Sequence, residues 1–149
     1  MKRVFPVLFF ALLAALGANA QSAQKITEID EAVEISYGQF CYLIGTSTSA
    51  VDDSATYLQA FETIRKTGVF RSDVMAIDPI PLYDIALLCS KTWNIKGSLL
   101  YMATKSARYA FKQMQALDMI PLTADPMSPA TGHQVLNIIT KCIDYSSEQ

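Results

Sequence analysis

Apolar residues recur at helical spacing in three separate stretches of this chain. Within each stretch, apolar residues follow a first one at three and at four positions along the chain, so they fall on one face of an α-helix. The first stretch contains Phe40, Leu43 and Ile44, the second Ile85, Leu88 and Cys89, and the third Val135, Ile138, Ile139 and Cys142. This pattern predicts three core helices and an all-α fold.

A similar six-residue phrase opens each of these stretches: ISYGQF at 35–40, IPLYDI at 80–85 and ATGHQV at 130–135. In the first and third phrases a Ser or Thr is followed three residues later by Gln, the pattern of a capping box. In the middle phrase a proline stands at the helix entrance and an aspartate in the first turn, where it suits the helix dipole. The predicted cap residues are Ser36, Gln39, Pro81, Asp84, Thr131 and Gln134.

Two apolar residues bound each phrase, one before the cap and one four positions into the helix. Such residues meet as a hydrophobic staple, which fixes how the chain enters the helix. The pairs are Ile35 with Phe40, Ile80 with Ile85, and Ala130 with Val135. The phrases therefore predict three stapled helix starts.

A longer repeat relates the second and third phrases. When the chain is shifted by fifty residues, Ala60 and Phe61 fall on Ala110 and Phe111, and Pro79 falls on Pro129. Matched character at a fixed period is typical of an internal structural repeat. Each full repeat is predicted to be a helix, a loop and a helix.

The outer helices of the repeat are expected at about 54–66 and 106–117, with Leu58, Phe61 and Ile64 facing inward in the first of them. Asp52 and Asp53 precede that helix and are expected to cap it. The loops at 71–79 and 121–129 are rich in turn-forming residues. We expect these loops to be ordered by Val74, Ile77 and Met127.

Two segments lie outside this pattern. Residues 21–34 are polar, although Ile26, Ile29 and Val33 could form one short turn or a helix. The connector at 96–102 is unusually apolar, and we expect it to pack beneath the outer helix; the alternative is an exposed patch that binds a partner.

The N-terminus resembles a secretory signal peptide. Lys2 and Arg3 precede an apolar run at 4–16, and small residues end the segment at Ala18 and Ala20. Because the run is shorter than the roughly 20 residues that span a bilayer, cleavage after Ala20 is favoured over an uncleaved anchor. The predicted organisation is a signal peptide at 1–20, a polar segment at 21–34 and one helical domain at 35–146, with units at about 35–51, 52–95 and 102–146.

If residues 1–20 are a signal peptide, the chain is exported, and we expect it in the periplasm or cell envelope. Removal of Lys2 and Arg3 leaves ten Lys and Arg against fourteen Asp and Glu, a net charge of −4. No basic run remains that could follow a nucleic-acid backbone, so nucleic acid is not an expected partner. No later stretch is apolar enough to predict a membrane span.

Three cysteines, Cys41, Cys89 and Cys142, remain after cleavage. An odd count allows at most one internal pair and leaves one thiol over. Their spacing matches no metal or redox motif, and His133 is the single histidine, so no metal and no cofactor is expected. Because all three lie within predicted helices, we expect them to be small buried apolar residues.

The three phrases and the helix–loop–helix units resemble the S-layer homology (SLH) domain, over roughly residues 35–145. The resemblance implies a bundle in which three phrase-bearing helices surround a pseudo-threefold axis, as one partial and two nearly complete units. It also implies attachment of an exported protein to the cell wall or its polymers. Family members that bind anionic wall polymer usually carry an arginine after the Thr; the matching positions here are Tyr37, Leu82 and Gly132.

No pattern in the chain indicates an enzyme, because it has no phosphate loop, no nucleophile–base set and no metal spacing. We therefore expect a non-enzymatic envelope module that attaches to cell-wall polymer or to another envelope protein. The candidate binding residues are Tyr37, Tyr83 and His133, which lie near the three helix starts. The alternative is a helical periplasmic protein that encloses a small apolar ligand, which the five methionines that remain after loss of Met1 would suit.

Overall fold

The computed structural model describes residues 22–96 and 99–148, and within them the chain forms seven helices and no strand. The predicted signal peptide lies outside these residues. A helix at 22–30 is followed by α2 (Tyr37–Ser47), α3 (Tyr57–Arg65), α4 (Leu82–Thr92), α5 (Leu99–Thr104), α6 (Ala107–Ala116) and α7 (Gly132–Ser147). The all-α prediction is confirmed.

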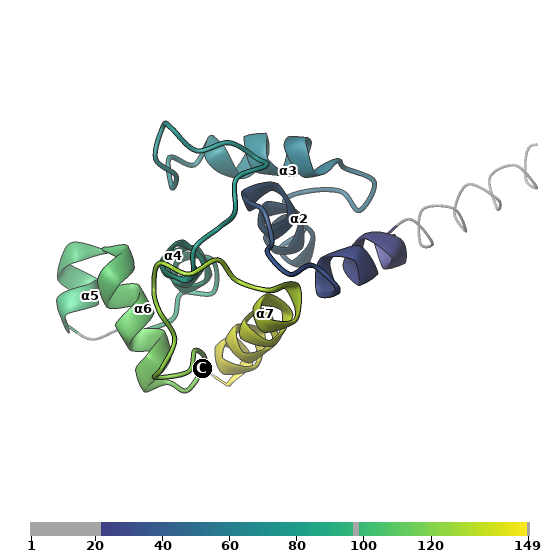
Figure 1. Ribbon diagram of the computed structural model, residues 1–149. Helices are drawn as coiled ribbons and strands as arrows, with labels where there is room; N and C mark the ends of the chain where they lie inside the picture. Colours follow the sequence, from purple (N-terminus) through teal and green to yellow (C-terminus); the bar gives the residue numbers. More distant parts are fainter. Residues whose placement is uncertain (1–21, 97–98, 149) are drawn as a thin grey trace, which may run out of the picture.

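Three helices that begin with the repeated phrase lie nearest the centre. Figure 1 shows α2, α4 and α7 around this centre, with α3 against α2 and α6 against α4. The short helix α5 packs on α6. The helix at 22–30 lies beside the start of α7, where the N–H of Gly132 donates to the carbonyl of Ala32 at 2.9 Å.

The first residues of the three phrases are joined by a closed ring of backbone hydrogen bonds. The N–H of Ile35 donates to the carbonyl of Ala130 at 2.9 Å. The N–H of Ala130 donates to Ile80 at 3.3 Å, and the N–H of Ile80 donates to Ile35 at 3.0 Å. Each phrase thus contacts both others, although they are far apart in the sequence.

Each helix start is also bonded to the loop that leads into another helix start. In α2 the N–H groups of Tyr37 and Gly38 donate to Asp78 and Ala76, at 3.0 and 2.8 Å. In α4 the N–H groups of Leu82 and Tyr83 donate to Ser128 and Pro126, at 3.1 and 3.0 Å. These bonds satisfy N–H groups that a helix leaves unpaired at its first turn.

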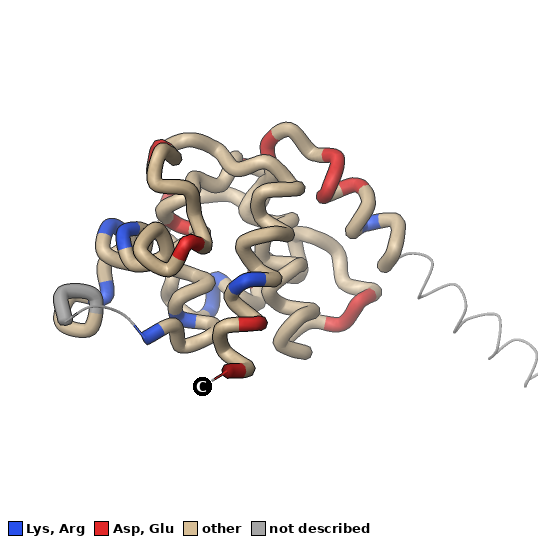
Figure 2. Tube along the Cα trace, turned by 90° about the horizontal axis from the view of Figure 1, so that it is seen from below, with Lys and Arg blue, Asp and Glu red and all other residues tan. Residues whose placement is uncertain are grey.

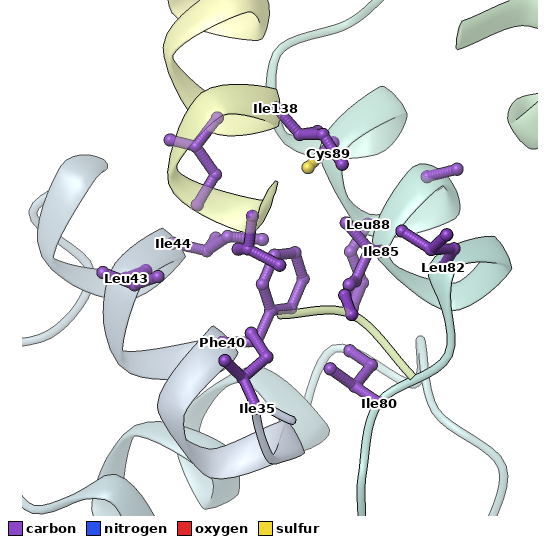
Figure 3. Close-up of a cluster of buried hydrophobic side chains, with 14 of the residues drawn as sticks. Ile35, Phe40, Leu43, Ile44, Ile80, Leu82, Ile85, Leu88, Cys89 and Ile138 are labelled. Carbon is purple, nitrogen blue, oxygen red and sulfur yellow. The ribbon is translucent and has the colours of Figure 1, made fainter. Parts of the chain in front are cut away.

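The staple residues form the middle of the apolar core. All six have no exposed surface: Ile35, Phe40, Ile80, Ile85, Ala130 and Val135. In Figure 3 the side chains of Ile35, Phe40, Ile80 and Ile85 point toward one another. The ten residues predicted to form the three apolar faces are all buried, so this prediction is confirmed.

The caps formed at all three phrases, in different ways. Ser36 and Gln39 make both arms of a capping box, at 3.2 and 2.9 Å. In α7 the Thr131 hydroxyl accepts from the N–H of Gln134 at 3.2 Å, but the Gln134 side chain does not bond back to the N–H of Thr131, so the predicted capping box is present only in part. Pro81 caps α4 without a side-chain bond, and Asp84 lies in the first turn as expected.

The outer helices differ from the prediction in detail. Phe61 is buried and Ile64 partly so, but Leu58 is 60% exposed, so its predicted inward orientation was wrong. The helix α3 starts at Tyr57 because Thr56 and Gln59 form a capping box. Asp52 and Asp53 therefore do not cap it; Asp52 accepts instead from the N–H and hydroxyl of Ser54.

The two long loops are held by aspartates more than by apolar side chains. Asp78 accepts from the N–H of Met75 at 2.7 Å, and Asp125 accepts from the N–H of Met127 at 2.9 Å. Val74 is buried as predicted, but Ile77 and Met127 are 79% and 67% exposed. Polar turn bonds order these loops, which leaves both apolar side chains free to face outward.

The segment before the first phrase is a helix, at residues 22–30. Ile29 is fully buried and Ile26 is partly buried, whereas Val33 is exposed. This segment therefore contributes to the same core as the three phrases. Part of the apolar connector, residues 97 and 98, lies outside the described residues; in the remainder α5 packs on α6, and Met102 is exposed.

Candidate functional site

Tyr37 and Tyr83, two of the three predicted binding residues, line one hollow. This polar hollow, of about 300 Å³, lies over the starts of α2 and α4, between the loops at 71–79 and 121–129. Arg71, Asp73 and Met127 contribute to its walls. The backbone bonds that join each helix start to a neighbouring loop place these side chains together.

Tyr37 is almost fully buried, and its phenol donates a hydrogen bond to Asp84. Burial, followed by the bond to Asp84, raises the pKa of Tyr37. Burial also raises the pKa of Asp84, and it outweighs the opposing effects of Tyr37 and Arg71. The pair links α2 to α4 beneath the hollow, which makes Tyr37 part of the scaffold.

Arg71 is the cation of this hollow. Its side chain lies on the surface, 3.8 Å from the carboxylate of Asp73. Electrostatic interaction with Tyr83, followed by that with Asp73, raises the pKa of Arg71. Because Asp73 and Asp78 also line the hollow, the net charge of its lining residues is not positive.

His133 lies apart from the two tyrosines. Its side chain is 85% exposed, and its Nδ1 atom is 3.3 Å from the carboxylate of Asp30 in the N-terminal helix. It borders two other hollows, beside α7. His133 and Tyr83 are the second residues of their helices whereas Tyr37 is a first residue, so the three positions are not equivalent.

The first helical positions of α2, α4 and α7, to which the expected SLH resemblance would assign an arginine, face inward. Tyr37 and Leu82 are almost fully buried, and Gly132 is buried against the N-terminal helix. A charged side chain at these positions would have to enter the packed centre, where an unpaired charge is strongly destabilising.

A larger, apolar groove adjoins the polar hollow and shares Tyr83 and Met127 with it. The groove has a volume of about 640 Å³ and runs along α6 beside the loop at 121–129. Phe111 and Ala124 line it, together with Arg108 and Lys112. The sequence reasoning missed this groove, although the fifty-residue alignment already places small Ala124 opposite Val74.

The cysteines were predicted to be buried apolar residues, and this is confirmed for Cys41, Cys89 and Cys142, all of which are free thiols. Burial raises the pKa of Cys41. Burial, followed by the neighbouring thiol of Cys142, raises the pKa of Cys89.

Within residues 22–96 and 99–148, no group of three or more His, Cys, Asp or Glu side chains is placed to hold a metal ion. Over the same residues, no helix has the length and apolar character that crossing a membrane requires.

Comparison with protein-family models, with curated proteins and with solved structures finds no match for this chain.

Proposed function

We propose that this chain is a non-enzymatic, SLH-like module of the cell envelope, which attaches an exported protein or forms a subunit of a periplasmic assembly. Three observations support the kind of module. The three phrase-bearing helices surround one centre, their first residues form a ring of hydrogen bonds, and each helix start is bonded to a loop. The pseudo-threefold axis of the module would pass through the centre of this ring.

The observation that carries the proposed role is the apolar surface of the two ordered loops. Ile77 and Met127 occupy equivalent positions of the repeat, and both are largely exposed. Met75 and Leu122, in the same two loops, are exposed as well. Apolar side chains held outward on ordered loops are typical of an interaction surface.

This surface favours a protein partner over a wall polymer. The buried first helical positions leave no place for the arginines that the SLH family uses toward anionic polymer. A polar polymer also gains little from contact with Ile77 and Met127, whereas a protein partner can bury both. Tyr83 lines both the polar hollow and the apolar groove. It would contribute a tyrosine side chain, which is often important at interfaces.

A pull-down from envelope extract tests the proposal, in parallel with pelleting of the chain with purified cell-wall sacculi. We expect the chain to capture a protein, and Ile77→Asp with Met127→Asp to abolish the capture. Leu58→Asp is the matched control, because Leu58 is also an exposed apolar residue but lies on α3. The proposal would be contradicted if the double variant still captured the protein. It would also be contradicted if the wild-type chain captured no protein in the pull-down and stayed in the supernatant in the pelleting assay.

The apolar groove favours a second candidate function, the binding of a small apolar ligand. Its volume of about 640 Å³ lies within the usual range for small-molecule sites. Native mass spectrometry after gentle purification tests this candidate, since a retained ligand adds mass that denaturation removes.

A further inference from the structure

The groove along α6 has an apolar floor and small side chains at its walls. Phe111 forms part of it and is only 5% exposed over its whole surface. Ala107 and Ala124 also line the groove, and neither side chain extends beyond a methyl group. An apolar concave surface of this kind excludes water when an apolar ligand occupies it.

The sister unit of the repeat shows what is missing here. At the positions equivalent to Ala107 and Ala124 it has Tyr57 and Val74. Val74 is buried, and the ring of Tyr57 packs edge to face on Tyr42 with centroids 5.6 Å apart. The same backbone thus accepts larger side chains at both positions, so the groove follows from side-chain size.

The charge of the groove also differs from that of the sister unit. Arg108 and Lys112 stand one turn apart on α6 and are exposed along the groove, where the sister unit has Leu58 and Glu62. The ion pairs found among the described residues involve neither cation. None of the described residues that line the groove is acidic. Figure 2 shows cationic positions on α6, at the side of the molecule away from the N-terminal helix.

The loop that forms the opposite wall is fixed in place. The side-chain amide of Gln115, on α6, donates to the carbonyls of Pro121 and Leu122, at 3.0 and 3.2 Å. In the sister unit Arg65, at the equivalent position, donates to Ser72 at 3.0 Å. The groove therefore exists before any ligand binds, which lowers the entropic cost of binding.

We propose that this groove binds a small anionic amphiphile, with its apolar chain against Phe111 and its carboxylate or phosphate group at Arg108 and Lys112. The inference rests on the second candidate function and specifies the class of ligand. An apolar body alone would use the floor of the groove, but it would leave the paired cations without a counter-charge. A single anionic head group reaches both, because they lie on the same side of α6.

Calorimetric titration of the purified chain with decanoate, decyl phosphate and decanol tests the inference. The three probes share one apolar chain, and the two anions distinguish a carboxylate from a phosphate head group. We expect at least one anion to bind about tenfold or more tightly than decanol, as a charge-assisted contact provides. Equal binding of all three probes, or no binding of either anion, would overturn the proposal.

Variants taken from the sister unit separate the two parts of the groove. Arg108→Leu with Lys112→Glu should weaken anion binding about tenfold or more and leave decanol binding unchanged. Lys66→Leu with Lys91→Glu makes the same change in net charge elsewhere on the surface, and it should leave the affinity for the anions as it is. An equal loss in both double variants would mean general electrostatic attraction and would overturn the assignment to Arg108 and Lys112.

Ala107→Tyr with Ala124→Val fills the groove and should abolish binding of decanol and of both anions. Thermal unfolding followed by circular dichroism establishes that each variant is folded. Binding that survives in the folded, filled variant would contradict the proposed location. The attachment proposal has a different readout, the capture of a protein by the chain. Failure of the amphiphile to bind therefore does not decide the attachment proposal, and failure of protein capture does not decide the amphiphile proposal.

Discussion

Gly132 is a residue at which two elements of the fold approach closely. It is the first residue of α7, and its N–H donates to Ala32 at 2.9 Å. A Cβ atom at this position would overlap the carbonyl oxygen of Ile29. The requirement is for space, which distinguishes Gly132 from Gly68, where φ is 73° and no atom lies within 4 Å of a Cβ.

Gly132→Ala should lower the free energy of unfolding by about 3 kcal/mol, because the methyl group displaces the N-terminal helix. Urea denaturation measures this loss, and faster trypsin cleavage at Lys25 would show that the helix is displaced. Gly68→Ala is the control and should lower stability by only about 1 kcal/mol, through backbone strain. Equal losses in the two variants would contradict the close packing at Gly132.

The pair of Tyr37 and Asp84 gives a pH-dependent prediction. Because the pKa of Tyr37 is raised in the folded state, the unfolded chain loses this proton first, near pH 10. The stability due to Tyr37 is therefore fully present below about pH 10 and is lost as the pH rises further. Tyr37→Phe should lower stability by about 1–3 kcal/mol at neutral pH, since Asp84 loses its donor.

Urea denaturation between pH 7 and 11 tests this prediction. The difference in stability between the wild type and Tyr37→Phe should shrink above pH 10, because only the wild type has this titrating phenol. A constant difference over the whole range would contradict the raised pKa of Tyr37.

The buried cysteines predict slow reaction with thiol reagents. Cys41 and Cys89 have raised pKa values, and all three thiols are buried, so the reactive thiolate is scarce and inaccessible. Iodoacetamide at pH 8 should modify the native chain slowly and the urea-unfolded chain at three positions. Mass spectrometry counts the adducts, and rapid modification of any cysteine in the native chain would contradict its burial.

At the scale of the elements, helix starts depend on how each is capped. Ser36 makes both arms of a capping box, whereas Ser106 at the start of α6 makes no side-chain cap bond. Ser36→Ala should lower the free energy of unfolding by about 1 kcal/mol, and Ser106→Ala by much less. Denaturant unfolding of the two variants measures the difference; similar losses would show that the Ser36 cap contributes little.

The sequence predicted the core helices well because their determinants are local. The 3.6-residue spacing of Phe40, Leu43 and Ile44 defines a buried face within a few turns, as do the corresponding sets in α4 and α7. The orientations of Leu58, Ile77 and Met127 were wrong for the opposite reason. Side chains of an outer helix or loop point inward only if another element covers them, and that depends on contacts distant in the sequence.

In the candidate site, too, the features that depend on local sequence could be predicted, and those that depend on contacts distant in the sequence could not. Proximity of Tyr37 and Tyr83 followed from the phrase, because both lie at helix starts that meet. The phrase could not show that Tyr37 is buried on Asp84, nor that Arg71 comes from a loop to the same hollow. It also placed His133 with the tyrosines, although the start of α7 faces the N-terminal helix.

On the scale of the whole molecule, the ring of hydrogen bonds connects the fold to the proposed role. It joins three chain segments at 35, 80 and 130, and it positions the loops that carry Ile77 and Met127. The N-terminal helix and the turn that follows it take part in the same arrangement, through Ile29 and Ala32 respectively. Both proposed binding surfaces therefore depend on three helix starts meeting at one centre.

Amide hydrogen exchange, followed residue by residue by NMR, tests this convergence most directly. The N–H groups of Ile35, Ile80 and Ala130 lie outside the helices and would exchange quickly if the phrases did not meet. The ring predicts that all three exchange as slowly as amides in the middle of α2, because they open only when the core unfolds. Exchange of any one of them at the rate of an exposed loop amide would contradict the closed ring.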